Sequence, residues 1–494
     1  MRYFLGIDNG GTMTKAAVFD EKGREIAVDS RPTPVKRPCD GQSERDMELL
    51  WKITAECIRS AIEKSGVPPE SIVSVGLSGH GKGLYLWGKN GRPVRPAISS
   101  TDRRAEDIVA RWEKDGTAKA AAELTLQKVI ACQPVALLRW LKENEPQSLE
   151  KIRWIFSCKD YIRFRLTSVA MSEFTDLSGT SLMNLGTMKP DMRLNEIFGI
   201  REISDCIPPL CSSCDNAGSV TEEAALLTGL RPGTVVSGGM FDIDACAVAM
   251  GVFDPEKLCT VTGTWSINEY PSSVAVPAES GTSNSIFCVP DKYLVEESSP
   301  TSAGNLEWFL ENFMKSEGGK SGSELYEAVD GAVDGISPEE SQVIFLPFLY
   351  GANAGCGDAV FAGVTERTKK KHLLRAIYEG VAFSHRWHIE RLLRFRERPQ
   401  AIRMAGGAVN SPVWVQMFAD VLSIPIETVT VKQLGALGVS MAAAVAAGVY
   451  PDLETAAENM IPTVSTVTPS PERAKAYEIK YRRYLSLIKR MEGF

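Results

Sequence analysis

The first residues able to do chemistry are a carboxylate and a glycine turn near the N-terminus. Asp8 precedes Gly10-Gly11-Thr12 within the run Gly6 to Lys15. Apolar residues at 2–5 and 16–19 predict two strands, and the glycines permit a tight hairpin turn between them. The backbone N–H groups of such a turn suit phosphate oxygens, and Asp8 can orient a Mg²⁺ ion. A plain hairpin with one surface Asp explains the same residues equally well.

A similar element recurs in the second half of the chain. Leu258 to Thr262 has the pattern of an apolar strand, Gly263-Thr264 is a small-residue turn, and Trp265 to Ile267 is again extended. Two such turns, one in each half, suggest a duplicated fold that grips a nucleotide between its halves. The repetition favours phosphate binding for both turns.

Two carboxylates, Asp242 and Asp244, follow the turn Gly238-Gly239 and precede a run of small residues that predicts a helix. Asp242 at the start of this helix can act as the general base for a substrate hydroxyl. Phosphoryl transfer needs alignment and a proton acceptor more than covalent chemistry. An Asp in this place is also a common N-cap. Asp244 is the rival base and the better candidate for a structural cap.

Adjacent glycines, Gly406 and Gly407, join a predicted strand at 401–405 to a helix that begins at Ser411. They allow a flat ring or a phosphate to approach the backbone, and they leave the N–H groups of the helix directed at it. Asn410 and Gln416 can hydrogen-bond the edges of a nucleotide. A tight strand–helix turn without a ligand is the alternative.

A third glycine-rich segment, residues 76–83, ends a buried strand and contains His80 and Lys82. The small residues leave room for a ligand, and the two side chains offer donors to hydroxyl or carbonyl oxygens. Asp102 and Arg103 can add sugar contacts. His80 can instead be a core histidine with satisfied hydrogen bonds, and Asp102 can cap a helix that begins at Arg103.

The elements that position these residues alternate between strands and helices. Apolar spacing predicts a strand at 71–77 and helices over 46–66, 369–396, 411–422 and 472–489, the first with Asp46 as N-cap and Gly66 past its end. Such alternation implies α/β layers, with helices covering a largely buried sheet. No Pro/Gly-rich linker is present, so we expect two domains, 1–246 and 247–494, joined by a hinge.

The predicted helix over 369–396 contains an Arg–Glu pair and a glycine. Arg375 and Glu379 are spaced for an intrahelical ion pair worth roughly a few tenths of a kcal/mol. Gly380 inside the helix suggests close packing on another helix.

Bulk properties describe an ordinary globular protein of more than one domain, with 494 residues, 44% hydrophobic and 24% charged. A net charge of −7 argues against a nucleic-acid partner. No long apolar run predicts a membrane span, and no leader pattern precedes the first strand. The odd number of cysteines, 11, favours free thiols in a reducing compartment, so we expect a cytoplasmic location.

Taken together, these motifs closely resemble the FGGY family of carbohydrate kinases, within the sugar kinase, actin and heat-shock ATPase superfamily. The resemblance covers nearly the whole chain. It is carried by Gly6 to Lys15, Gly239-Met240-Phe241-Asp242, Thr262-Gly263-Thr264, His372 to Ala382, Gly406-Gly407-Ala408 and Gln416 to Asp420. Within the family the chain is most similar to the L-xylulose kinases, through Ser43 to Met47, Gly81 to Leu84, Ser99 to Arg104, Ser299 to Phe309 and Phe345 to Gly355.

The resemblance implies an α/β fold of two ribonuclease-H-like lobes with a catalytic cleft between them, and it implies ATP and Mg²⁺. Asp242 falls on the family's catalytic base. Asp8, our candidate magnesium ligand, falls with the Gly10-Gly11-Thr12 turn on the family's first phosphate element. Nucleotide contacts are implied for Gly10, Gly11, Thr12, Thr14, Lys15, Gly263, Thr264, Gly406, Gly407, Ala408 and Asn410. Together with the residue-based reasoning above, we expect sugar contacts from His80, Gly81, Lys82, Asp102, Arg103 and Asp242.

Two departures from the family pattern bear on the substrate. His80, Gly81 and Lys82 replace the polar pair that glycerol and xylulose kinases use on their substrates, and Ile243 replaces an amide residue that often follows the base. We expect phosphorylation of a terminal hydroxyl of a ketopentose, with L-xylulose first, and a possible homodimer. A kinase of a sugar alcohol or another ketose is the alternative, and an actin-like or chaperone-like ATP-binding protein is the non-enzymatic one.

Overall fold

The structure is a computed structural model, and it describes residues 1–263, 265–314, 322–349, 351, 357–429, 431–462 and 464–491. The chain divides into two compact units, each made of three segments. The first comprises Met1–Phe253, Pro271–Val295 and Val431–Pro462, and the second Asp254–Tyr270, Glu296–Thr430 and Thr463–Phe494. The domain division at 246 and 247 stays a prediction. The compact units differ from it because residues 431–462 belong to the first unit.

A mixed sheet forms the centre of the first unit. Its strand order is β13-β14-β5-β1-β2-β3, and β15 pairs with β5. The strands are β1 (Tyr3–Asn9), β2 (Met13–Asp20), β3 (Glu25–Pro32), β5 (Ile72–Gly79), β13 (Asn216–Ser219), β14 (Val235–Ser237) and β15 (Met240–Phe241). The predicted N-terminal hairpin is confirmed, since β1 and β2 pair antiparallel from Tyr3↔Asp20 to Asn9↔Thr14.

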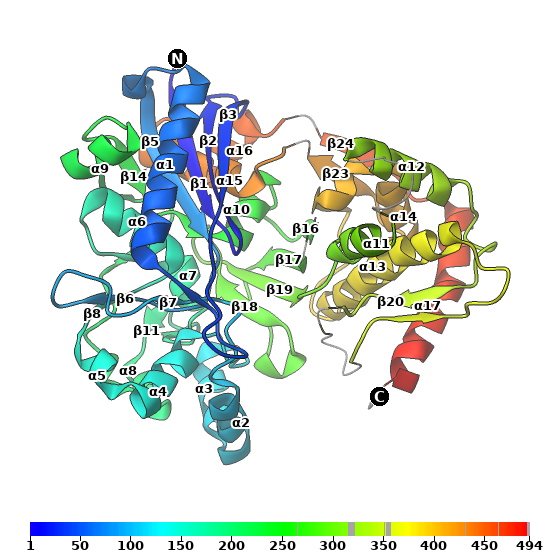
Figure 1. Cartoon of the computed structure of the whole chain (residues 1–494), viewed down its shortest axis with the longest axis horizontal. Coiled ribbons are helices and arrows are strands. Elements are labelled where there is room, and N and C mark those ends of the chain that lie inside the picture. Colours follow the sequence, from blue (N-terminus) through cyan, green and yellow to red (C-terminus); the bar gives the residue numbers. More distant parts are fainter. Residues whose placement is uncertain are drawn as a thin grey trace. The chain divides into compact units, whose positions relative to one another are not determined.

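Helices cover both faces of this sheet (Figure 1). On one face lie α1 (Met47–Ser65), α6 (Cys158–Thr167) and α9 (Glu222–Thr228), and on the other α10 (Asp242–Ala249), α15 (Leu434–Ala446) and α16 (Leu453–Met460). The first helix is confirmed with both predicted caps, because the Asp46 side chain accepts a hydrogen bond from Leu49 N and Gly66 is left-handed. Side chains alternate along a strand, so Leu5 and Ile7 of β1 join the α1-side core.

The opposite face of β1 and β5 carries residues small enough for α15 to approach the strands closely. A Cβ at Gly6 would lie 1.9 Å from Ala436 O, and one at Gly76 would lie 1.9 Å from Val439 O. Ser74 of β5, on the same face, donates to Ala443 O over 2.7 Å. The helix itself is rich in Gly and Ala and almost wholly buried. Backbone contact between helix and sheet therefore fixes this layer.

A second hydrophobic core in the first unit lies among short helices and a two-stranded sheet. Its elements include β6 (Tyr85–Gly88), β8 (Ile152–Phe156), α2 (Glu106–Asp115), α3 (Thr117–Thr125), α4 (Pro134–Asn144), α5 (Pro146–Glu150) and α8 (Met192–Ile197). The predicted helix start at Arg103 is wrong, since α2 begins at Glu106. Between α6 and this core runs α7 (Phe174–Ser178), whose N-cap is Glu173.

The second sheet has the strand order β18-β19-β17-β16-β22-β23-β24. Its strands are β16 (Lys257–Thr262), β17 (Ser266–Ser272), β18 (Ser283–Ile286), β19 (Tyr293–Ser299), β22 (Ala401–Gly406), β23 (Ile426–Val429) and β24 (Val464–Val467). The second unit also holds β20 (Ile344–Leu346), β21 (Val360–Ala362), α11 (Gly304–Phe313), α12 (Ser323–Asp334), α13 (Lys370–Leu392), α14 (Pro412–Leu422) and α17 (Pro471–Met491). The predicted strand at 401–405 and the three helices predicted in this region are confirmed.

The Arg375–Glu379 pair in α13 is confirmed at 2.8 Å, but it is buried rather than exposed. Arg375 also donates to Tyr477 of α17 over 2.6 Å, and Lys480 of α17 pairs with Glu379. The pair therefore ties α13 to α17 instead of stabilising one helix. Gly380 does mark a close approach, but the neighbour is a strand, since a Cβ there would lie 2.4 Å from Phe345 O of β20.

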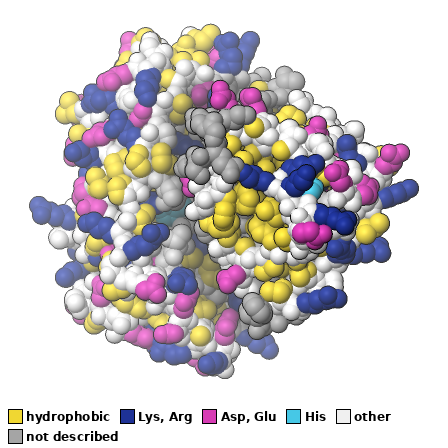
Figure 2. Space-filling model, turned by 45° about the vertical axis from the view of Figure 1, so that its right-hand side comes forward, with side chains coloured by type: hydrophobic (Ala, Val, Ile, Leu, Met, Phe, Trp, Pro, Cys, Tyr) yellow, Lys and Arg dark blue, Asp and Glu magenta, His cyan; other side chains and the backbone are white. Residues whose placement is uncertain are grey.

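No helix in the described ranges is both long and apolar enough to cross a bilayer. On the face drawn in Figure 2, Lys and Arg side chains lie among Asp and Glu side chains, as the small negative net charge leads one to expect. The absence of a nucleic-acid partner stays a prediction.

The contact between α15 and the first sheet gives a stability prediction. Gly76→Ala forces a methyl group into the carbonyl of Val439, so we expect a loss of about 3 kcal/mol in unfolding free energy. The matched control is Gly331→Ala in α12, where a Cβ meets nothing within 4 Å. That change should be neutral or stabilise by about 1 kcal/mol through helix propensity. Urea unfolding of both variants decides, and equal midpoints would contradict the packing.

Candidate active site

Parallel pairing brings the ends of three strands together at one edge of the first sheet. Strands β1 and β15 both run parallel to β5, and Asp8 and Met240 both pair with Ser78. Asp8 lies near the end of β1, His80 directly follows β5, and Asp242 directly follows β15. In open α/β sheets, ligands bind outside the carboxyl ends of parallel strands. This edge is therefore the candidate active site of the first unit.

A one-residue bulge precedes Asp242. Val236 pairs with Val75, whereas Met240, four residues later, pairs with Ser78, three residues later. The extra residue falls at the Gly238-Gly239 turn, where Gly239 has φ +74° and a Cβ would lie 2.3 Å from Leu77 O. Bulges bend a strand and redirect the side chains that follow. Here the bulge sets the direction in which the chain enters α10.

Asp242 is the first residue of α10, and its side chain is half-buried. The N-cap is Phe241, so the interpretation of Asp242 as a helix N-cap is wrong. A carboxylate in the first turn of a helix interacts favourably with the helix dipole. The geometry is compatible with a general base, and that role stays a prediction.

Asp244 is fully buried, and its Oδ1 accepts a hydrogen bond from Cys288 N over 2.9 Å. Burial, reinforced by the neighbouring carboxylate of Glu173, raises its pKa well above the usual range. Because this carboxyl group is enclosed by protein on all sides, it does not reach a substrate hydroxyl in this conformation. The structural interpretation of Asp244 is therefore favoured over its role as rival base, although it anchors the segment at Cys288 rather than capping α10.

Asp8 of β1 is half-buried, and its carboxylate lies beside Gly435 at the start of α15. Ser78 Oγ donates to Asp8 Oδ1 over 3.1 Å, and a Cβ on Gly435 would lie 3.0 Å from Oδ2. Burial raises the pKa of Asp8, while Lys15, paired opposite on β2, lowers it. A carboxylate in such surroundings is stabilised in its ionised form by a cation, and carboxylate oxygen is the ligand that Mg²⁺ prefers. The chemistry of Asp8 thus fits a magnesium ion, and this role stays a prediction.

The hairpin turn exposes Gly11 and Thr12, and Gly10 is half-buried. Arg45 supports the turn from beneath, since its Nη1 donates to Gly10 O over 3.2 Å and its Nη2 donates to Gly11 O. The turn carbonyls are thereby engaged on the protein side. Thr14 is different. Its side chain is buried and accepts from Asn9 Nδ2 over 3.0 Å, so it supports the hairpin from inside and does not face a ligand.

His80 lies in the protein interior with partners on both ring nitrogens. Its Nε2 lies 2.9 Å from Tyr85 Oη and its Nδ1 lies 3.3 Å from Gly81 O. Burial, with a contribution from the Arg45 guanidinium, lowers the pKa of His80 to about 3. The interpretation as a satisfied core histidine therefore describes it better than a direct sugar contact.

The two residues that follow His80, Gly81 and Lys82, have different surroundings. Gly81 packs against the ring of Phe241, because a Cβ there would lie 2.2 Å from Cε2. Lys82 is half-buried, has φ 60° and lines a small cavity with Asp160 and Asp176. Of the predicted sugar contacts in this turn, Lys82 is the side chain placed to reach a ligand.

Asp102 is buried in an ion-pair network. It accepts from Ser43 N over 2.6 Å and pairs with Arg104 at 2.9 Å, and Arg104 also pairs with Glu44. Its side chain is 0% exposed, so this conformation does not present it to a sugar, and the sugar contact stays a prediction. Arg103 is 61% exposed at the side chain and lies 3.8 Å from Glu106. Asp102 therefore joins the segments around residues 43 and 102.

The predicted nucleotide-binding residues of the second unit lie at the carboxyl ends of β16 and β22, which pair in parallel up to Thr262↔Gly406. Gly406 has φ +97°, and a Cβ there would lie 2.5 Å from Thr262 O. The turn continues as a 3-10 helix, Gly407–Asn410, in which Gly407 and Asn410 are exposed and Ala408 is buried. Gly263 is half-buried, and Thr264 lies outside the described residues.

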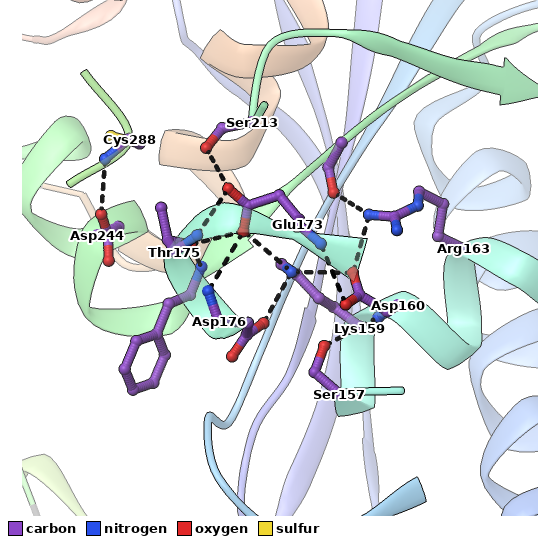
Figure 3. Close-up of polar contacts among 12 residues, drawn as sticks. Ser157, Lys159, Asp160, Arg163, Glu173, Thr175, Asp176, Ser213, Asp244 and Cys288 are labelled. Atoms are coloured by element: carbon purple, nitrogen blue, oxygen red, sulfur yellow. Dashed lines mark hydrogen bonds and ion pairs between the residues drawn. The ribbon is translucent and has the colours of Figure 1, made fainter. Parts of the chain in front are cut away.

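A buried cluster of charges was not predicted from the sequence (Figure 3). Lys159 Nζ lies 3.0 Å from Asp160 Oδ1, 3.2 Å from Glu173 Oε2 and 2.8 Å from Asp176 Oδ2. Arg163 pairs with Asp160 at 2.9 Å. The sequence feature that could have indicated this cluster is the pair of adjacent opposite charges, Lys159-Asp160, at the start of a helix. Nothing in the sequence connects this pair to Glu173.

Comparison with models of known protein families identifies the family of this chain. A model of the N-terminal domain of the FGGY family of carbohydrate kinases matches residues 3–249, and one of its C-terminal domain matches residues 258–447. The chain belongs to the FGGY family of carbohydrate kinases. This FGGY kinase is therefore an enzyme that transfers a phosphoryl group to a carbohydrate, and the predicted family and reaction class are confirmed.

Two relatives match the FGGY kinase over its whole length. The L-xylulose/3-keto-L-gulonate kinase of Escherichia coli (strain K12) is 38% identical, covering 100% of this chain and 98% of that protein. The probable L-xylulose kinase of Pasteurella multocida (strain Pm70) is 37% identical, covering 99% and 98%. A crystal structure of a ligand-bound xylulose kinase from Lactobacillus acidophilus has a TM-score of 0.90 at 22% identity, covering 100% and 99%. The predicted two-lobed α/β fold class is confirmed.

The burial of His80 predicts acid sensitivity. The unfolded chain takes up a proton at this histidine near its ordinary pKa of about 6.5, whereas the folded protein does so only near 3. The folding free energy therefore weakens as the pH falls below about 6.5, the pKa in the unfolded chain. The loss reaches about 2 kcal/mol at pH 5. His80→Gln should lose less stability between pH 7 and pH 5 than the parent in thermal unfolding. His385, whose pKa is also lowered to about 3 by burial, contributes equally to both proteins. An identical pH dependence would contradict a neutral His80.

Proposed function

We propose that this FGGY kinase phosphorylates a terminal hydroxyl of a ketopentose, with L-xylulose as the first candidate, ATP as the donor and Mg²⁺ as the metal. The observation that carries the proposal is the full-length identity of 38% and 37% to two proteins named as kinases of L-xylulose. The side chains at the carboxyl edge of the first sheet supply the groups that this reaction needs. We further propose a cytoplasmic location and a possible homodimer.

In this proposal Asp242 accepts the proton of the terminal hydroxyl as that oxygen attacks the γ-phosphoryl group in line. The exposed N–H groups of Gly11 and Thr12 bind phosphate oxygens, and Arg45 holds the turn in place from the protein side. Gly406, Gly407 and Asn410 contact the nucleoside, and Lys82 contacts sugar oxygens. Asp8 would hold the magnesium ion, which neutralises charge on the phosphates.

A second candidate substrate is a ketose that carries a carboxylate. One relative is named for both L-xylulose and 3-keto-L-gulonate. Lys82 supports this candidate, because it forms no ion pair with any carboxylate of the described residues within 4.0 Å. An ammonium group near the substrate turn can recognise a carboxylate as well as a hydroxyl oxygen.

A substrate panel separates these candidates. ADP release should require a sugar. In a panel of ketopentoses, 3-keto-L-gulonate, pentitols, erythritol and glycerol, kcat/KM should be highest for L-xylulose or 3-keto-L-gulonate. Lys82→Met should reduce kcat/KM about tenfold or more for the carboxylated ketose and less for L-xylulose, since only the former loses a charge pair. Turnover that is highest with a sugar alcohol would overturn the substrate proposal.

The base is tested separately. Asp242→Asn should lower kcat by about a thousandfold or more because the amide cannot accept the hydroxyl proton, while the Kd for ATP changes little. Asp46→Asn is the matched control, since it alters an Asp at the N-terminus of α1 and keeps its capping oxygen. Its kcat should equal that of the parent. An Asp242→Asn variant with the parental kcat refutes the assignment.

A further inference from the structure

A hydroxyl group from a neighbouring helix contacts the backbone directly before Asp242. The N–H of Phe241 donates to Thr175 Oγ1 over 2.8 Å. Thr175 lies in α7, 66 residues earlier in the chain, and its side chain is 0% exposed. The hydrogen bond therefore connects a fixed interior helix to the residue that leads into the base.

The direction of this hydrogen bond is set by Glu173. Thr175 Oγ1 donates its own proton to Glu173 Oε2 over 2.6 Å, so the oxygen has only acceptor capacity left for Phe241 N. Glu173 Oε1 in turn accepts from Ser213 Oγ over 2.8 Å and from Thr175 N over 3.1 Å. Figure 3 shows this arrangement converging on the Glu173 carboxylate.

Lys159 anchors the carboxylate from the other side. Its Nζ lies 3.2 Å from Glu173 Oε2, and both side chains are 0% exposed. Water cannot replace a lost partner at such depth, so every member of the chain Lys159–Glu173–Thr175 keeps one orientation. These three side chains are therefore rigid, as a group that positions another residue has to be.

The same interior also grips the bulge that precedes Phe241. Arg163 Nη1 donates to Gly238 O, Gly238 N donates to Asp215 O over 3.0 Å, and Gly239 N donates to Ser213 O over 3.1 Å. The backbone is thus held at both ends of the segment from Gly238 to Phe241. Thr175 supplies the contact nearest to Asp242.

We propose that Thr175, oriented by Glu173 and Lys159, is a positioning residue that aims Asp242 at the substrate hydroxyl. The proposal rests on the proposed role of Asp242 as the base. A displacement of about 1 Å at a reacting group can cost about a hundredfold in rate. Loss of the Thr175 hydroxyl leaves Phe241 N–H without its acceptor and removes this constraint on the start of α10.

The test uses the full-length enzyme with Thr175→Val, which keeps the shape and removes the hydroxyl, and Thr175→Ser, which keeps the hydroxyl. Thr175→Val should lower kcat about tenfold to a hundredfold, with KM for sugar and ATP changed less than about threefold. Thr175→Ser should restore kcat to within about threefold of the parent. A purely structural role would not produce this separation of kcat from KM.

A matched control accounts for lost stability. Thr228 in α9 is also 0% exposed, and its hydroxyl donates to Ala224 O over 2.8 Å and accepts from Leu230 N over 3.3 Å. Thr228→Val likewise removes one donated and one accepted hydrogen bond, in a helix that is not next to the base. It should lower the thermal midpoint as Thr175→Val does and leave kcat unchanged.

A double-mutant cycle separates the two proposals. In an Asp242→Asn background, Thr175→Val should lower single-turnover phosphoryl transfer no further, because its effect passes through Asp242. An equal loss in both backgrounds, a parental kcat in Thr175→Val, or an equal loss of kcat in Thr228→Val overturns the positioning role alone. A parental kcat in Asp242→Asn overturns the base, and the positioning role with it.

Discussion

The candidate active site depends on the parallel alignment of β1, β5 and β15. Because the three strands run in one direction, Asp8, the turn after β5 and Asp242 reach the same edge of the sheet. The alignment in turn depends on close contact with α15, which Gly6 and Gly76 permit by lacking side chains. The same helix begins beside Asp8, where Gly435 leaves room for the carboxylate. One packing contact therefore sets both the sheet and the surroundings of its first acidic residue.

Charges beneath this edge hold their positions through one another. Lys159 and Arg163 face several carboxylates in the interior. Burial raises the pKa of Asp176 to about 6, and it also raises the pKa of Asp244 well above its usual range. Buried ion pairs contribute little net stability, because desolvation offsets their attraction. Their more specific effect is orientation, since each partner restricts the rotamers of the other. In this molecule the oriented groups lead, through Thr175, to the backbone before the proposed base.

The sequence predicted the segments whose signals are local. Apolar spacing with an N-cap and a C-terminal glycine located α1 at both ends, and glycine between two apolar runs located the hairpin. Thr14, through the resemblance, and Asp102, through its residue type, were expected to contact ligands, yet both are buried. Neither signal reveals whether a polar side chain points inward. Arg45 and Thr175 were missed because their partners lie 34 to 66 residues away in the chain. Pairings at that separation are decided by the tertiary fold, and no periodicity encodes them.

Packing around the turn after β5 limits which of its residues can contact a ligand. Gly81 is held against the ring of Phe241, the residue before the proposed base, so a side chain at position 81 would collide with that ring. His80 is turned inward to Tyr85. Lys82 has a left-handed backbone conformation and lines a cavity that Asp176 also lines. Of these three residues, Lys82 is therefore the one whose polar side chain can reach a ligand in that cavity. Phe241 contacts this turn and precedes Asp242, so the proposed substrate contact and the proposed base have one aromatic ring as a common neighbour. A substitution that repacks this ring should therefore alter specificity and turnover together.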